Sequence, residues 1–160
     1  MKSKKKALAG KENSFEKAVN ATKQISGSYQ KGLQALGQYA NKITLGDTRQ
    51  CQGSVDIDSA VERLHSGENR WDYCFCYKNE ALFVEVHPAN TSDVSVVLNK
   101  LTWLVNWLNE EAPEINKLKA KSMHPFYWIQ TKGFHIPPTS RQFRQVVEKG
   151  LKPINLLKIK

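Results

Sequence analysis

The chain has 160 residues, 40% of them hydrophobic, and carries a formal net charge of +9 at pH 7. This length and hydrophobic content allow one domain with a buried core and exclude a disordered protein, and no run approaches the ~18 apolar residues of a membrane span. No long apolar stretch follows the basic N-terminus, so we expect no secretory signal, and three cysteines suit free thiols in a reducing, cytoplasmic setting.

The positive charge lies at the two ends of the chain. Residues 1–42 hold nine lysines and two glutamates, and residues 115–160 hold ten basic residues and one acidic residue. Residues 43–114 hold five basic and twelve acidic residues. This layout favours a carboxylate-rich site flanked by phosphate-binding surface. The alternative is that the charges serve solubility alone.

Residues 12–43 place apolar side chains three and four positions apart, which is the spacing of a helix. Gly27, Gly32 and Gly37 lie inside this range and weaken a helix by about 1 kcal/mol each, so the helix is either broken or needs a partner surface. We expect residues 1–45 to form a basic tail and a helical extension. This extension is a candidate contact for a second copy of the chain or for another protein.

Residues 46–160 are expected to form a single α/β domain, and its first elements are weakly marked. Residues 46–54 predict a loop or a poor edge strand. Asp58 or Ser59 can cap a short helix that runs to Leu64.

Two apolar, aromatic-rich runs, residues 71–77 and 81–86, predict a β-hairpin. A two-residue turn at positions 78–79 would place Asp72 directly opposite Glu85, with Cβ atoms about 4.5–5.5 Å apart. Two like charges at that distance repel each other, so folding does not favour them. A divalent cation between them would remove the repulsion. The two faces of the hairpin are otherwise apolar, which indicates a sheet that is covered on both sides.

The elements after the hairpin alternate between helix and strand. A helix from Asp93 to about Glu111 carries a wide apolar stripe, is expected to be buried on more than one side, and ends at Pro113. We further expect a strand at 126–131, a short return strand at 134–136, a helix from Thr139 or Ser140 to Lys149, and a last strand at 154–159. Together these elements predict an α/β (or α+β) domain with a small central mixed sheet covered by helices.

Candidate site residues follow this order of elements. Glu62 lies on the short helix, Asp72 on the first hairpin strand, and Glu85 and His87 on the second. With Lys100 on the helix that follows, the chain resembles the PD-(D/E)xK nuclease-like superfamily. His87 stands where that superfamily usually has lysine.

The resemblance covers about residues 58–131 and implies a restriction-endonuclease-like core in which Asp72 and Glu85 hold Mg²⁺ or Mn²⁺. In such sites the metal polarises the scissile phosphate and lowers the pKa of a bound water. His87 can replace the usual lysine as an imidazolium, act as a general base, or ligate a softer metal such as Mn²⁺.

Two more residues have roles that only the resemblance implies. Lys100 can reach in from its helix, because members of the superfamily relocate the lysine, and Glu62 can assist a second metal or orient a water. Purely structural interpretations stand beside these. Asp72 can pair with Arg70, His87 can be a structural residue at a strand end, and Lys100 and Glu62 can be solvated side chains.

Other kinds of site have weaker support. A zinc site would combine Cys74 and Cys76 with His65 and His87, but the hairpin register turns both cysteines toward apolar residues and the sequence has no C-x-x-C. The glycine-rich phosphate loops and the serine nucleophile elbow have no counterpart in the sequence.

The basic residues near the C-terminus form a candidate nucleic-acid-binding set. Arg141 and Arg144 share one face of the last predicted helix, and the helix dipole near its N-terminus adds to their attraction for phosphate. The alternative is an ordinary solvated helix face. The full set comprises Lys117, Lys119, Lys121, Lys132, Arg141 and Arg144.

The sequence therefore predicts a metal-dependent nuclease-like domain that hydrolyses phosphodiester bonds. Its partner would be nucleic acid, with DNA favoured over RNA, and we expect no membrane contact. The alternative is a catalytically inactive module of similar fold that binds nucleic acid or a protein. Only the nuclease interpretation predicts stabilisation by Mg²⁺ or Mn²⁺ that requires Asp72 and Glu85.

Overall fold

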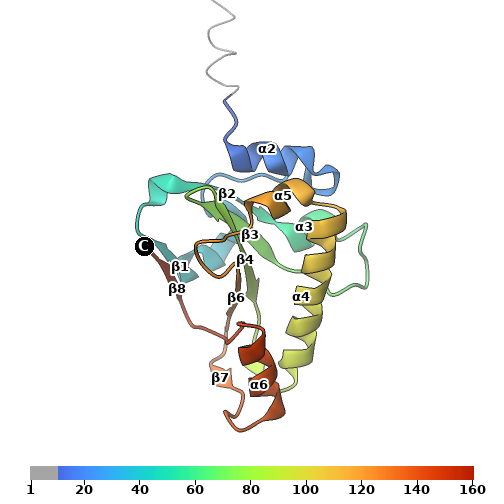
Figure 1. Ribbon diagram of the computed structural model, residues 1–160, viewed down its shortest axis with the longest axis vertical. Coiled ribbons are helices and arrows are strands. Elements are labelled where there is room, and N and C mark those ends of the chain that lie inside the picture. The colour runs from blue at the N-terminus through green and yellow to red at the C-terminus, as the bar shows by residue number, and fades with distance from the viewer. Residues whose placement is uncertain (1–10) are drawn as a thin grey trace, which may run out of the picture.

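The computed structural model describes residues 11–160, which form a mixed sheet with helices packed around it (Figure 1). The central sheet has the strand order β2 (Cys51–Asp56), β3 (Tyr73–Tyr77), β4 (Glu80–Val86) and β6 (Phe126–Ile129). The first three strands form an antiparallel meander, and β6 lies parallel to β4. The prediction of an α+β domain with a mixed sheet flanked by helices is confirmed.

A parallel strand pair needs a crossover connection, and α4 (Asp93–Glu110) provides it between β4 and β6. In Figure 1 this helix runs along one side of the sheet. Its buried stripe joins Cys74 and Cys76 of β3 in one hydrophobic core. Phe75 and Tyr77, which alternate with them, belong to a second core. The hairpin is therefore covered on both faces, as predicted.

The hairpin also has the predicted register. The residues at positions 78–79 have φ values of +51° and +64°, as a type I′ turn requires of its two central residues. The strands then pair as far as Tyr73 with Val84. The next pair in this register is Asp72 with Glu85, although Asp72 itself lies just before β3.

The N-terminal segment is not the long helix that its spacing predicts. α2 (Ser14–Ala21) is followed by two 3₁₀ helices, η1 (Lys23–Ile25) and η2 (Gln34–Lys42). Gly27 and Gly32 between them have φ values of +84° and +50°, which a right-handed helix excludes. Side chains of α2 and η1 enter the same core as α4. This part of the predicted extension is thus covered by its own chain.

The elements before the hairpin are better defined than the sequence indicates. β2 is a true edge strand with a bulge between Cys51 and Gly53. The next helix, α3 (Ile57–Val61), has Asp56 as its N-cap, because the Asp56 carboxylate accepts a hydrogen bond from the Ser59 backbone N–H at 3.0 Å. The prediction of Asp58 or Ser59 as the cap is therefore wrong.

Two short parallel pairs lie outside the central sheet. β1 (Ile43–Leu45) pairs with β8 (Leu157–Ile159), and β5 (Ala89–Asn90) pairs with β7 (Phe134–His135). The prediction that residues 134–136 return along the preceding strand is wrong, because β7 pairs with β5. The remaining elements are η3 (Thr48–Gln50), α5 (Pro113–Leu118) and α6 (Arg141–Glu148).

The two helices of the C-terminal third lie at opposite ends of the central sheet. α5 lies near the β3–β4 turn, where the Ala120 backbone N–H donates to the Ala81 carbonyl at 3.0 Å, and α6 lies at the other end (Figure 1). Pro113 begins α5, which suits a residue without an N–H. Ser140 caps α6, as predicted. Within residues 11–160 no helix combines the length and the apolar character that crossing a membrane requires.

We expect the substitution Gly53→Ala to destabilise the fold. Gly53 has a φ of +148°, and an added Cβ would lie 2.2 Å from the Tyr29 ring and 2.8 Å from the Gln30 carbonyl oxygen. Overpacking of this kind costs about 1–3 kcal/mol and the backbone strain about 1–2 kcal/mol more. Gly67→Ala is the matched control, since Gly67 has a φ of +77° but open space around it. Urea unfolding of the two variants should show the larger loss for Gly53→Ala, and equal losses would contradict the expectation.

Candidate functional site

Asp72 and Glu85 meet at the end of the hairpin that lies away from its turn. The Asp72 backbone N–H donates to Glu85 Oε1 at 3.2 Å, and the Val86 backbone N–H donates to Asp72 Oδ2 at 3.0 Å. Each carboxylate therefore has one oxygen that accepts a hydrogen bond from the backbone at or next to the other acid. The predicted proximity of the two acids is confirmed.

Lys100 lies between the two remaining carboxylate oxygens. It projects from α4, about two turns after the helix begins, and its Nζ lies 2.5 Å from Glu85 Oε2 and 3.4 Å from Asp72 Oδ1. The ammonium therefore occupies the position between the acids where the sequence predicts a divalent cation. Lys100 does reach in from its helix.

Burial strengthens the charge interactions in this group and shifts the pKa values of its members. The Glu85 side chain is fully buried, while those of Asp72 and Lys100 retain 19% and 16% of their exposure. Burial and the neighbouring Glu85 raise the pKa of Asp72 to about 7, despite the opposing effect of Lys100. Burial lowers the pKa of Lys100, but Glu85 and Asp72 outweigh it and hold that pKa above its ordinary value. Lys100 is therefore a permanent cation in this site.

His87 lies beside this group and is held by two carboxylates. Its Nδ1 is 3.5 Å from Glu85 Oε2, and its Nε2 is 3.2 Å from Asp93 Oδ1. The hydrogen bond with Glu85 raises the pKa of His87 against the effect of burial. The His87 carbonyl accepts a hydrogen bond from Trp128 Nε1 at 2.9 Å. These contacts fix the ring in one orientation.

Asp93 is the member of the group that the sequence does not identify. It is the first residue of α4, and its second carboxylate oxygen accepts from the Asn90 backbone N–H at 2.9 Å. The sequence marks it only as part of a helix start. Its contact with His87 depends on how α4 docks against the sheet, and the local sequence around Asp93 does not predict this docking.

Glu62 is not part of this group. It follows the last residue of α3, is exposed, and makes no hydrogen bond or ion pair with any residue that the structure describes. Arg70 does not pair with Asp72 either. Its Nε lies 2.8 Å from Asp58 Oδ1, and its Nη1 donates to the His65 carbonyl.

The candidate nucleic-acid-binding residues lie at two ends of the sheet. The Lys121 backbone N–H donates to Glu80 at the turn end, and Lys117 pairs with Glu114 on α5 at 2.8 Å. Arg141 and Arg144 lie exposed on α6, at the end where β6 runs into β7 (Figure 1). This is also the end that carries Asp72 and Glu85, because β4 runs parallel to β6. Lys119 lies with the first set, and Lys132 precedes β7.

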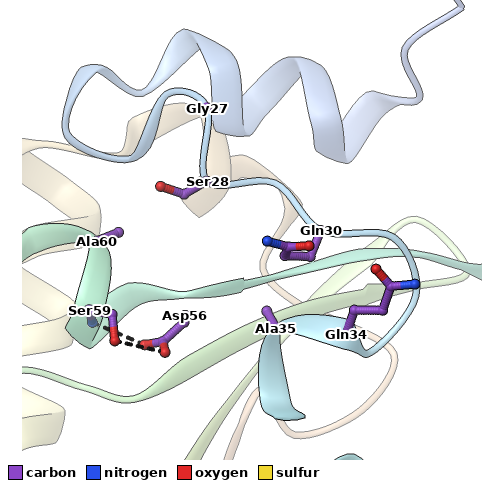
Figure 2. Close-up of a pocket in the computed structure, with 8 residues that line it drawn as sticks. All are labelled: Gly27, Ser28, Gln30, Gln34, Ala35, Asp56, Ser59 and Ala60. Atoms are coloured by element: carbon purple, nitrogen blue, oxygen red, sulfur yellow. Dashed lines mark hydrogen bonds between the residues drawn. The ribbon is translucent and has the colours of Figure 1, made fainter.

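A hollow of about 450 Å³ lies apart from the group around Glu85 (Figure 2). It lies between the loop that contains Ser28 and Gln30 and the start of α3, and none of the residues grouped around Glu85 lines it. Its only charged side chain is Asp56, whose two oxygens already accept from Ser59 N and Oγ. Its one carboxylate thus serves the cap of α3, and its other polar side chains are serines and glutamines.

The acid pair is the candidate metal position. Among residues 11–160 no three His, Cys, Asp or Glu side chains gather as a metal-binding group. Mg²⁺ commonly takes one or two carboxylates and fills the rest of its shell with water. Asp72 Oδ1 and Glu85 Oε2 converge on one cation, which is Lys100 here. The pair thus fits a divalent ion on condition that the Lys100 side chain moves.

The substitution Asp72→Asn should change how stability depends on pH. The folded protein holds the Asp72 proton more tightly than the unfolded chain does, so the stability gained from it is present below about pH 4 and is lost as the pH rises to about 7. Relative to the wild type, the variant should gain up to about 4 kcal/mol between pH 4 and pH 8. Urea unfolding in metal-free buffer measures this difference.

Asp47→Asn is the control of opposite sign. Hydrogen bonds from Arg49 and then Gln50 lower the pKa of Asp47, so this variant should lose stability relative to the wild type as the pH rises through the acid range. A gain for both variants, or for neither, would show that the environment of Asp72 is not the cause.

The comparisons with known proteins give the chain no relative. No protein-family model, no curated protein and no solved structure matches it significantly. The choice of function therefore depends on the chemistry of Asp72, Glu85, His87 and Lys100.

Proposed function

We propose that this chain is a metal-dependent nuclease-like domain that hydrolyses phosphodiester bonds in nucleic acid. The observation that carries the proposal is the contact of Lys100 Nζ with both Asp72 and Glu85. Two acids and a lysine converge at the end of adjacent strands, where they can serve one reacting group. Nothing in the packing of a core requires three charged side chains there.

The order of the elements supports the same proposal. The acids lie just before β3 and near the end of β4, α4 follows with Lys100, and β6 completes the sheet parallel to β4. This order of elements resembles that of the PD-(D/E)xK superfamily. A restriction-endonuclease-like core is part of the proposal.

Asp72 and Glu85 would hold Mg²⁺ or Mn²⁺, which when bound would polarise the scissile phosphate and lower the pKa of a bound water. The protein groups have separate tasks. Lys100 supplies a positive charge beside the position where negative charge develops on phosphate. Asp72, whose pKa of about 7 is that of the metal-free site, would release its proton in order to hold the metal, so its task is that of a ligand.

We assign the task of the usual lysine to Lys100 and a positioning task to His87. Both ring nitrogens of His87 face carboxylates, those of Glu85 and Asp93. The ring therefore has no free nitrogen to act as a base, and its raised pKa favours the imidazolium. In this form His87 orients Glu85 and adds a second positive charge to the site.

Phosphate contacts are proposed for the α6 end of the domain. Arg141, Arg144 and Lys132 are exposed at the same end of the sheet as Asp72 and Glu85. Lys117, Lys119 and Lys121 lie near the hairpin turn, so they can at most contact a distant part of a long nucleic acid.

One observation favours a second candidate, a catalytically inactive module that binds nucleic acid or a protein. Lys100 Nζ donates a charge-assisted hydrogen bond to the fully buried Glu85 carboxylate, and such bonds are roughly twice as strong as neutral ones. Lys100 would then serve only as the counter-ion of two buried acids, and metal would not bind.

Metal binding and cleavage distinguish the two candidates. The nuclease proposal predicts that Mn²⁺ at 100 times its Kd raises the free energy of unfolding by about 2.7 kcal/mol. It also predicts cleavage of plasmid or oligonucleotide that falls about 100-fold or more in Glu85→Gln and Asp72→Asn, since polarisation by a metal contributes several kcal/mol. Thermal unfolding with and without Mn²⁺, together with gel-based cleavage, measures both effects.

Glu114→Gln is the matched control, since this exposed glutamate pairs only with Lys117 among residues 11–160. It should leave the metal response and the cleavage unchanged. A wild-type chain that shows no Mn²⁺ stabilisation and no cleavage would contradict the nuclease proposal and leave the binding module.

Nucleic-acid affinity should depend on α6 more than on α5. Replacing Arg141 and Arg144 by glutamine should weaken binding and reduce the slope of log K against log salt by about 0.7–0.9 for each lost phosphate contact. Lys117→Gln should have a smaller effect, because Lys117 is already paired with Glu114 at the other end of the sheet. Fluorescence-anisotropy titrations at several salt concentrations measure this. Equal slopes for all variants would contradict the placement of the nucleic acid at α6.

A further inference from the structure

A hollow with charged and aromatic side chains lies at the C-terminal end of α4, on residues that the proposed nuclease site does not use. It measures about 210 Å³ and opens between the last turns of α4 and the loop after α3. Aromatic side chains form its wall and carboxylates form its rim. The residues that matter here are His65, Glu68, Trp103, Trp107, Glu110 and Glu111.

The aromatic wall is preorganised. The Trp103 and Trp107 rings stack with centroids 5.7 Å apart and an interplanar angle of 11°, and His65 meets Trp103 at 90°. Each indole N–H already has an acceptor, with Trp107 bound to Gln24 at 2.9 Å and Trp103 to Glu68 at 3.2 Å. The rings are thus fixed. Trp107 is only 3% exposed and stacks on Trp103, so the half-buried Trp103 is the indole that a ligand can contact.

The carboxylates of the rim have no cation to balance them. Glu110 and Glu111 make no side-chain hydrogen bond or ion pair with any residue among 11–160, and within the same residues Glu68 contacts His65 but no lysine or arginine. Both glutamates lie at the C-terminal end of α4, where the helix dipole disfavours negative charge and where no basic residue is present. Folding does not favour this arrangement, whereas an arriving cation would relieve it.

We infer that this hollow binds a lysine or arginine side chain from a basic segment of a partner protein. A cation over an indole face is attracted by the ring quadrupole, most strongly for tryptophan. The three carboxylates and the carbonyl end of α4 add attraction of the same sign. A nucleic-acid backbone is excluded, because its phosphates would meet these carboxylates.

A hexalysine peptide titrated into the full-length chain tests the inference without metal or nucleic acid. Saturation should shift the Trp103 indole N–H signal in NMR spectra, with Trp103→Phe used to assign it, and hexaglutamate should not. The double variant Glu110→Gln/Glu111→Gln should bind hexalysine about fivefold more weakly. Trp103→Leu should also weaken binding, by up to about fivefold.

The matched control is the double variant Glu114→Gln/Glu148→Gln, which removes two exposed charges outside the hollow. It should keep the wild-type affinity. Equal losses in the two double variants would overturn the inference, because the attraction would then be general. An unshifted Trp103 signal at saturation would also overturn it. Peptide binding that appears only after Lys2, Lys4, Lys5 and Lys6 are replaced by serine would overturn it as well. That result would mean that these lysines fill the hollow in the unmodified chain.

Discussion

The ammonium of Lys100 between Asp72 and Glu85 is the interaction on which the rest of this domain depends. The type I′ turn fixes the register of the hairpin, and that register brings two carboxylates together in the interior. Burying unpaired carboxylates costs several kcal/mol for each. The lysine that contacts both acids comes from α4, so the hairpin and the helix that covers it stabilise each other through charge as well as apolar contact. The parallel pairing of β6 with β4 requires the crossover connection that α4 provides.

The same group retains an imbalance that suits a further cation. Three carboxylates, from Asp72, Glu85 and Asp93, face two basic side chains, Lys100 and His87. Even with His87 protonated, the group has one more negative charge than positive when Asp72 is ionised. Burial and Glu85 then favour a proton on Asp72, which is why its pKa lies at about 7. A proton and a divalent ion would compete for the same oxygens, so the chemistry of the site and the stability of the fold are linked.

The hairpin and its acids could be predicted from sequence because their geometry is local: a two-residue turn and strand alternation settle which residues oppose each other. Local spacing failed over residues 12–43, where glycines with positive φ break a pattern that otherwise reads as helical. It also failed for the pairs β1–β8 and β5–β7, since strands of two or three residues far apart in the chain leave no periodic signal. Glu62 has the right position in the sequence, but α3 ends at Val61 and leaves it exposed. The contact of Asp93 with His87 likewise depends on helix docking.

Charge along the sequence and charge in space have different patterns, and the difference limits how a nucleic acid can approach. The acidic stretch of residues 43–114 supplies both the buried pair that Lys100 neutralises and the exposed Glu110 and Glu111 at the far end of α4. The basic C-terminal third is divided between α5, where Glu114 offsets Lys117, and α6, where the arginines are exposed without an acidic partner among the described residues. A phosphate chain is therefore attracted at the α6 end and repelled near the end of α4. The acids of the candidate site lie at the attractive end, so a nucleic acid held by α6 would be presented to them rather than to the opposite end of the sheet.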